Sequence, residues 1–284
     1  MKPFVNFIPT KLYFGAGQLG MLGTLPMPGK KALIVITSGK SMRASGTLDR
    51  VVKLLEHNKI ESAVYDKVQA NPTREQVMEG AAFAKKEKCD FVLGLGGGSP
   101  IDAGKAIAVM AANPGDYWDY VAGGTGKAQP IPNRPLPIVA VTTTAGTGTE
   151  ADPWTVVTNG NEKIGFGYEH TFPKISIIDP ELMLTVPPQL TAFQGFDAFF
   201  HAAECYLANI ATPISELYSL KSIELLCKSL PAAVADGEDL AARSDVALAN
   251  TLSGMVLCSP VFNDRTGWRD SSSALPGRFR PLEA

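Results

Sequence analysis

The sequence predicts an α/β protein, in which a parallel sheet covered by helices is followed by a domain of helices alone. As far as about residue 182, apolar runs of strand length alternate with amphipathic runs of helical period. A run of glycines, Gly96 to Gly98, separates one such strand from a helix. After Pro187 and Pro188 only helical patterns remain. We therefore expect a first domain over residues 1–185 and a helical domain over residues 186–258.

The expected strands are short and apolar, and the expected helices have recognisable start signals. Helix 73–88, for example, opens with a capping box of Thr73 and Gln76. Along the chain we expect strand 31–37, helix 48–57, strand 60–65, helix 73–88, strand 136–141, a hairpin of 154–158 and 162–166 turning at Asn159-Gly160, strand 174–179, and helices 190–208, 213–230 and 240–257. Alternating strands and helices imply a parallel sheet with ligands at the carboxyl ends of its strands.

The glycine run joins an apolar strand to an Ala-rich helix. Ser99 is expected to cap this helix, Pro100 to occupy its first turn, and Asp102 to complete a Ser-x-x-Asp capping pattern. Such a helix start offers free N–H groups to an anion where Gly97 and Gly98 leave space. A phosphate-bearing ligand fits this pattern.

Two familiar phosphate-binding patterns do not fit this stretch. The G-x-G-x-x-G pattern begins at Gly94 and Gly96 but has Ser99 in place of its third glycine. A P-loop fails in its spacing, and Lys105 is followed by Ala106 where a Mg²⁺-binding Ser or Thr belongs. The alternative is a glycine turn that serves only for close packing of the strand and the helix.

The composition excludes several classes of protein. The chain has 284 residues, of which 45% are hydrophobic and 19% charged, with a formal net charge of −2. These values describe a globular protein, and no basic field favours nucleic acid. No apolar run approaches the roughly 18 residues of a membrane span, and the N-terminal residues lack the apolar core of a signal peptide. The four cysteines are widely spaced, as is typical of reduced thiols, so we expect a cytoplasmic location and small-molecule partners.

A second candidate site lies on the first helix after the double proline. Asp197 and His201 are four residues apart, so the carboxylate and the imidazole project from one face of the helix. This is a usual way of presenting two ligands to a divalent metal ion. A hydrogen-bonded Asp–His pair at a domain interface is the alternative. The other two histidines, His57 and His170, are expected to have no ligand role.

A series of motifs runs along the chain as far as about Cys258. They are Phe14-Gly-x-Gly17, Gly94-x-Gly-Gly-Gly-Ser-Pro-x-Asp102 with Lys105, Thr142-Thr-Thr-Ala-Gly-Thr-Gly-Thr-Glu150, Lys163, Asp179-Pro-Glu-Leu182, Leu190-Thr-Ala and Gly195-x-Asp-Ala-x-x-His-Ala-x-Glu204. Together they resemble the iron-containing, group III alcohol dehydrogenase family. The resemblance implies a dinucleotide-binding α/β domain, an all-helical domain, and a cleft between them. It also implies a catalytic metal, usually Fe²⁺ and sometimes Zn²⁺, that polarises an alcohol or aldehyde oxygen.

The resemblance further implies roles for particular residues. Those expected to contact the nucleotide are Gly39, Lys40, Gly97, Gly98, Ser99, Asp102, Thr142, Thr143, Thr147 and Lys163. Asp197 and His201 would be catalytic, as the first two metal ligands. As alternatives, the Thr- and Gly-rich run forms only a tight loop, and Lys163 is only a solvated charge on a hairpin.

The chain departs from that family after Cys258. Family members carry two further histidine ligands on helices that follow the pattern seen here as Ala249-Asn250-x-Leu-x-Gly254-Met255, whereas residues 259–284 contain no histidine and no amphipathic period. We expect those residues to be an aberrant tail outside any packed element, from a truncated or frameshifted form of a longer gene. The metal site and the helical domain would then be incomplete.

Three functions remain open on this basis. The first is metal-dependent, NAD(P)-linked oxidation of a small alcohol or reduction of an aldehyde. The second is a catalytically incompetent, nucleotide-binding remnant of the same fold. The third is a metal-free relative such as a maleylacetate reductase, although the pair of Asp197 and His201 favours metal use. A homo-oligomer is compatible with each of the three.

The segment after the first predicted strand determines the expected cofactor. NAD-preferring members of the family often carry Asp there, which binds the adenosine ribose and repels a 2′-phosphate. This chain has no acid there and offers Ser38, Lys40 and Arg43 as donors, with Gly39 leaving room for the phosphate. NADP(H) is therefore expected over NAD(H). Alternatively, Lys40 and Arg43 are only solvated charges at the start of the next helix.

Overall fold

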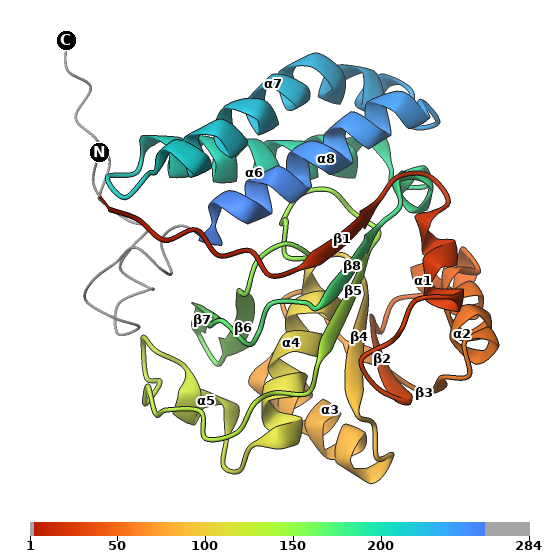
Figure 1. Cartoon of the computed structure of the whole chain (residues 1–284), viewed down its shortest axis with the longest axis vertical. Coiled ribbons are helices and arrows are strands. Elements are labelled where there is room, and N and C mark those ends of the chain that lie inside the picture. Colours follow the sequence, from red (N-terminus) through yellow and green to blue (C-terminus); the bar gives the residue numbers. More distant parts are fainter. Residues whose placement is uncertain (1–2, 259–284) are drawn as a thin grey trace.

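The computed structural model describes residues 3–258 and is built around a six-stranded sheet (Figure 1). The strands of this sheet are β1 (Lys11–Phe14), β2 (Lys31–Thr37), β3 (Glu61–Val68), β4 (Phe91–Gly96), β5 (Ile138–Thr142) and β8 (Ile175–Ile178). They lie in the order β1-β8-β5-β4-β2-β3, and neighbouring strands run parallel. A separate antiparallel hairpin consists of β6 (Thr155–Asn159) and β7 (Glu162–Phe166). The tail expected at 259–284 lies outside the described residues.

Helices cover both faces of the sheet. They are the 3-10 helix η1 (Gln18–Gly23), α1 (Ser41–Ala44), α2 (Thr47–His57), α3 (Arg74–Lys86), α4 (Gly98–Ala112) and α5 (Tyr117–Tyr120). Alternate side chains of β2 enter two different cores, because successive residues of a strand point to opposite faces. Leu33 and Val35 pack with α3, α4 and α5, whereas Ile34 and Ile36 pack with η1 and α2. This two-sided burial confirms the predicted α/β class.

Three longer helices form a layer at one end of the sheet (Figure 1). They are α6 (Pro188–Leu207), α7 (Pro213–Ala235) and α8 (Leu240–Val256), and they share a third core with the short 3-10 helix η2 (Pro180–Met183). Helix α7 continues through Pro231 instead of ending at residue 230. Ala233, beyond that proline, is fully buried in the core, so packing of the last turn offsets part of the cost of the lost N–H bond.

Most of the expected elements are present, with shifts of a few residues at their ends. The predicted capping box at the start of α3 is confirmed, because Thr73 Oγ1 accepts from the Gln76 N–H and Gln76 Oε1 accepts from the Thr73 N–H at 3.1 Å. Strand β1 has no counterpart among the expected elements. Its four residues are all at least partly exposed, so they lack the apolar run that marks a buried strand.

The prediction that Ser99 caps α4 is wrong. The helix begins at Gly98, with Gly97 as its N-terminal cap and no capping side chain. Glycine at both positions lets the chain enter the helix before Ser99 is reached. Ser99 Oγ instead accepts from the Asn71 N–H at 3.3 Å, and the Asp102 carboxylate accepts from the β6 backbone. The first N–H groups of α4 therefore donate to no N-cap side chain.

One side of α6 exposes large apolar side chains. Phe193, Phe196 and Phe200 are 62%, 56% and 56% exposed. Their spacing of three and four residues places them on neighbouring turns of the helix. Among the described residues, no helix is long and apolar enough to cross a membrane. We define these three residues as the α6 phenylalanine surface.

We expect the α6 phenylalanine surface to bind a hydrophobic dye and to promote self-association. Replacing Phe193 and Phe196 with serine should reduce the fluorescence of bound anilinonaphthalene sulfonate by about half or more. The melting temperature should change little, because these side chains are largely exposed. Light scattering after gel filtration measures the association. A monodisperse parent chain that binds no dye would contradict this expectation.

Candidate functional site

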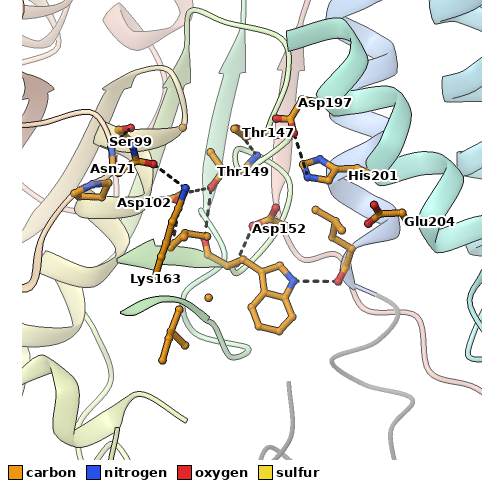
Figure 2. A pocket seen from close by; sticks show the side chains of 17 residues that line it. Asn71, Ser99, Asp102, Thr147, Thr149, Asp152, Lys163, Asp197, His201 and Glu204 are labelled. Carbon is orange, nitrogen blue, oxygen red and sulfur yellow. Dashed lines mark hydrogen bonds and ion pairs between the residues drawn. The ribbon is translucent and has the colours of Figure 1, made fainter. Parts of the chain in front are cut away.

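A cavity of about 520 Å³ opens beyond the carboxyl ends of the central strands. Gly98 and Ser99, which follow β4, and Thr147, which follows β5, line it. Asp197 and His201 of α6 lie across it from Ser99, and Thr147 lies between them in the view of Figure 2. Residues from the sheet and from the helical layer therefore meet in one cavity, at the place where parallel α/β sheets usually bind ligands.

The glycine turn packs tightly against the threonine-rich loop after β5. A Cβ atom at Gly97 would lie 2.9 Å from Thr144 Oγ1, and one at Gly98 would lie 2.8 Å from Thr147 Cγ2. Both distances are shorter than a real Cβ contact, so a larger residue at either position would force the Thr144 or Thr147 side chain to shift. Helix α4 starts here with uncapped N–H groups, and the helix dipole favours an anion at this end. The geometry suits the phosphate groups of a nucleotide.

Of the three threonines expected to contact a nucleotide, Thr147 lines the cavity. Thr142 and Thr143 are only 2% and 4% exposed. The Thr142 hydroxyl donates to the Thr144 carbonyl at 3.0 Å, and the Thr143 N–H donates to the Gly96 carbonyl at 2.9 Å. The first bond lies within the loop and the second joins the loop to β4. A nucleotide contact by either residue stays a prediction.

Lys163 lines the cavity from the hairpin and donates through Nζ to Asn71 Oδ1 at 2.7 Å. Asn71 follows β3 and has a φ of 60°, in the left-handed region that Asn tolerates better than most residues. Its N–H donates to Ser99 Oγ at 3.3 Å, so Asn71 connects the hairpin to the start of α4. Asn71 is not among the residues expected from the sequence. The feature of the sequence that could have identified it is the Asn71-Pro72 dipeptide, which is typical of a turn.

Gly39 and Lys40 are not among the described residues that line this cavity. They follow β2, and Lys40 is exposed. A Cβ atom at Gly39 would lie 3.8 Å from Thr37 Oγ1, and no other described atom, apart from those of its chain neighbours, would lie within 4 Å. The space beside Gly39 is therefore open. Arg43 already pairs with Asp66 at 2.7 Å. Lys40 is therefore the freer of the two cations expected to meet a 2′-phosphate.

Asp197 and His201 approach each other across one turn of α6. Asp197 Oδ1 lies 3.7 Å from His201 Nε2, which is too long for a hydrogen bond. His201 Nδ1 is buried and has no hydrogen-bond partner within residues 3–258. Burial raises the pKa of Asp197, and the neighbouring His201 opposes that shift. The carboxyl group and Nε2 of the imidazole face each other without a direct hydrogen bond, an arrangement compatible with a shared third partner.

The described residues supply two candidate metal ligands. Within residues 3–258, no group of three or more His, Cys, Asp or Glu side chains is placed to hold an ion. A catalytic Zn²⁺ site usually has three protein ligands, with water or substrate in the remaining position. Asp197 and His201 therefore do not fit a resident metal by themselves.

The loop after β5 also binds the last helix, α8. Asn250 Oδ1 accepts from the Gly148 N–H, and Asn250 Nδ2 donates to Glu150 Oε1, each at 2.9 Å. Thr251 Oγ1 donates to the same Glu150 oxygen at 2.9 Å. Glu150 is fully buried, and burial raises its pKa. Its second oxygen, Oε2, has no partner in the described part of the chain, which favours the neutral acid.

Buried carboxyl groups make the folding stability depend on pH. Burial raises the pKa of Asp152 to about 7, although Lys105 opposes the shift. Stability from such a group is complete below the pKa of the unfolded chain, near about 4, and is lost as the pH rises through the folded value. We expect the free energy of unfolding to fall by up to about 1.4 kcal/mol per pH unit for each such carboxyl between roughly pH 4 and 7. Urea unfolding at several pH values measures this, and Glu150→Gln should flatten the slope. A stability that rises over this range would contradict the assignment.

The parallel sheet and the open start of α4 are typical of a nucleotide-binding α/β protein, here followed by a helical layer. The family described as iron-containing alcohol dehydrogenase matches residues 9–180, and the C-terminal part of that family matches residues 191–262. The first match alone covers more than half of the chain. The chain belongs to the iron-containing alcohol dehydrogenase family.

Individual relatives and solved structures agree with this family. The 1,3-propanediol dehydrogenase of Klebsiella pneumoniae is 38% identical over 258 residues, which are 89% of this chain and 65% of the relative. The NAD-dependent methanol dehydrogenase of Bacillus methanolicus is 36% identical, over 88% of this chain and 65% of the relative. The structure of an archaeal alcohol dehydrogenase from a Red Sea brine pool has a TM-score of 0.86 at 36% identity, covering 90% of this chain and 66% of that one. The chain thus spans just under two thirds of the length of these relatives.

Proposed function

We propose that this chain binds NAD(P)(H) and acts in NAD(P)-linked oxidation of a small alcohol or reduction of the corresponding aldehyde. The observation that carries the proposal is the single cavity with the start of α4 on one side and the pair of Asp197 and His201 on the other. Similar proteins are named for 1,3-propanediol, methanol and choline, which are all small alcohols.

In this reaction a hydride moves between the carbinol carbon and the nicotinamide ring, and the hydroxyl proton leaves. The N–H groups at Gly98 and Ser99 would bind the pyrophosphate. Thr147 and Lys163, on the cavity wall, would bind the ribose and nicotinamide side. His201 Nε2, which lies 3.7 Å from Asp197 Oδ1 on the cavity wall, would hydrogen-bond a polar atom brought into the cavity. These residues orient the two reactants and exclude water between them.

A nucleotide-linked turnover assay tests the proposal. Consumption of NAD(P)H is followed by its absorbance after adding a short aldehyde, with and without Fe²⁺. Consumption of NAD(P)H that depends on the aldehyde supports the proposal. A chain that binds no nucleotide would contradict it. The Fe²⁺ arm addresses a second proposal, that Asp197 and His201 are two ligands of an Fe²⁺ or Zn²⁺ ion. Turnover that is indifferent to both metal and chelator would favour the metal-free relative, of the maleylacetate reductase kind.

The incompetent remnant is the second candidate function. It is favoured by one observation, that the described residues supply two candidate ligands and no third. This candidate predicts saturable binding of NAD(P)H with no consumption when aldehyde and Fe²⁺ are added. The two outcomes are exclusive, so one experiment distinguishes them.

The preferred nucleotide is proposed to be NADP(H). Lys40 is exposed beside the open space at Gly39, so its ammonium can pair with a 2′-phosphate. Replacing Lys40 with Asp puts a repelling charge there and should weaken NADPH binding about tenfold or more, while NADH binding weakens less. Calorimetric titration of both nucleotides measures the change. Tighter NADH binding by the parent chain, unchanged in Lys40→Asp, would refute the preference.

We keep three further assignments as proposals. The first is a division into a nucleotide part, 1–185, and a helical part, 186–258. The second is a cytoplasmic location, supported by four cysteines that are all free thiols. The third is a homo-oligomer, supported by the exposed α6 phenylalanine surface.

A further inference from the structure

Lys105 is a fully buried lysine on α4, the helix whose start forms the anion site. Its Nζ donates to the Thr149 carbonyl and hydroxyl at 2.7 and 2.6 Å, and to the Trp154 carbonyl at 2.7 Å. It also contacts the Asp152 carbonyl and Oδ1 at 2.9 and 3.1 Å. A buried ammonium is costly unless all its protons have acceptors, and here they do.

All of these acceptors belong to one short segment, residues 149–154, between β5 and β6. The segment contains no helix or strand, so its carbonyl groups point to the ammonium instead of pairing in a sheet. Thr149, Asp152 and Trp154 each line the cavity (Figure 2). Lys105 itself is not among the described residues of the cavity wall. It contacts the wall residues from the protein interior, on the side away from the cavity.

Lys105 also determines how the hairpin is attached. An ammonium can only donate, so the Thr149 hydroxyl accepts from it and keeps its own proton free. That hydroxyl donates to Asp102 Oδ1 at 2.6 Å. Asp102 Oδ2 accepts from the Val156 N–H at 3.0 Å, and this anchors β6 of the hairpin that carries Lys163. The contacts run without a break from the buried lysine to the β6–β7 hairpin, which carries Lys163 on the cavity wall.

We propose that Lys105 is a positioning residue, which shapes the nucleotide pocket by holding segment 149–154 and the β6–β7 hairpin onto α4. The identity of the ligand, NAD(P)(H), rests on the proposed function. The role of Lys105 in holding segment 149–154 does not depend on the identity of the ligand. The competing explanation is charge balance alone, in which Lys105 only neutralises the buried carboxylates of Asp102 and Asp152.

Two variants separate positioning from charge balance. Lys105→Met keeps the length of the side chain but removes its donors and its charge. Adding Asp152→Asn removes the carboxylate that contacts the Lys105 ammonium directly, and Asp102 keeps its hydrogen bonds from Thr149 and Val156. We expect the double variant to fold and to melt near the parent temperature, yet to bind NADPH about tenfold or more weakly. The backbone amides of residues 149–158 should exchange with deuterium about tenfold or more faster than in the parent chain.

A matched control uses Lys85 on the neighbouring helix α3. Its Nζ donates to the Asn113 carbonyl at 3.5 Å, away from the cavity-lining residues. Lys85→Met should leave both NADPH affinity and amide exchange unchanged. A folded double variant with parental affinity and exchange would overturn the proposal in favour of charge balance. If neither Lys105 variant folds, Lys105 supports the whole core and the proposal fails. If the parent chain binds no NADPH, the proposed function fails, and amide exchange still decides the role of Lys105.

Discussion

Replacing Gly254 with alanine is expected to lower the free energy of unfolding by about 2 to 3 kcal/mol. The new Cβ atom would lie 2.1 Å from the Gly148 carbonyl oxygen and 2.7 Å from its carbon. Both are backbone atoms, so α8 or the loop after β5 must move. Gly148 cannot give way easily, because its φ of 66° is already in the left-handed region and its N–H is bound by Asn250. The better helix propensity of alanine returns only about 1 kcal/mol.

Urea unfolding measures the effect of Gly254→Ala, with Gly20→Ala as the control. A Cβ atom at Gly20 would have no described neighbour within 4 Å, so that variant should be nearly as stable as the parent. Because the displaced loop carries Thr147 on the cavity wall, Gly254→Ala should also weaken nucleotide binding. A Gly254→Ala chain with parental stability would show that α8 does not pack against this loop.

Replacing Asp197 or His201 with alanine is expected to reduce turnover by about 100-fold or more. Nucleotide affinity should stay within about threefold, because the pair lies across the cavity from the start of α4. Turnover and nucleotide affinity should respond differently, because a group that acts on the reacting atoms affects the rate, whereas the anion site affects nucleotide binding. Steady-state rates and calorimetric titration of the same preparations measure both quantities.

The control for that pair is His57→Ala. His57 is an exposed residue at the end of α2 and is not among the described residues of the cavity wall, so both rate and affinity should persist. Equal loss of rate and affinity in Asp197→Ala would mean that the pair supports the fold. A parent chain that binds nucleotide without turnover would instead support the incompetent remnant.

The fold class was predictable because strands and helices differ in their hydrophobic period. Strand β2 has the expected bounds, and the Thr73 cap of α3 follows from local chemistry alone. Strand β1 was not predictable, since its four residues pair at the edge of the sheet with β8, more than 160 residues away along the chain. The start of α4 was misplaced because two glycines allow an earlier start than a Ser cap implies.

The candidate site was partly predictable for similar reasons. Gly98 and Ser99 stand out by their spacing next to a strand, and Asp197 and His201 by helical periodicity. Asn71 and Trp154 line the same cavity but have no periodic signal, because they lie in loops that tertiary contacts bring together. The role of Lys105 was not visible either, since its acceptors are mostly backbone carbonyls of a distant segment.

The central claim is that the cavity between the start of α4 and α6 is a nucleotide site. Energy transfer from tryptophan to bound NAD(P)H tests it most directly, because Trp154 lines that cavity. We predict saturable quenching of tryptophan emission together with enhanced nicotinamide emission. Both changes should be lost in Gly98→Leu, whose side chain would collide with Thr147 and cover the helix start. No saturable transfer in the parent chain, or equal transfer in Gly98→Leu, would contradict the claim.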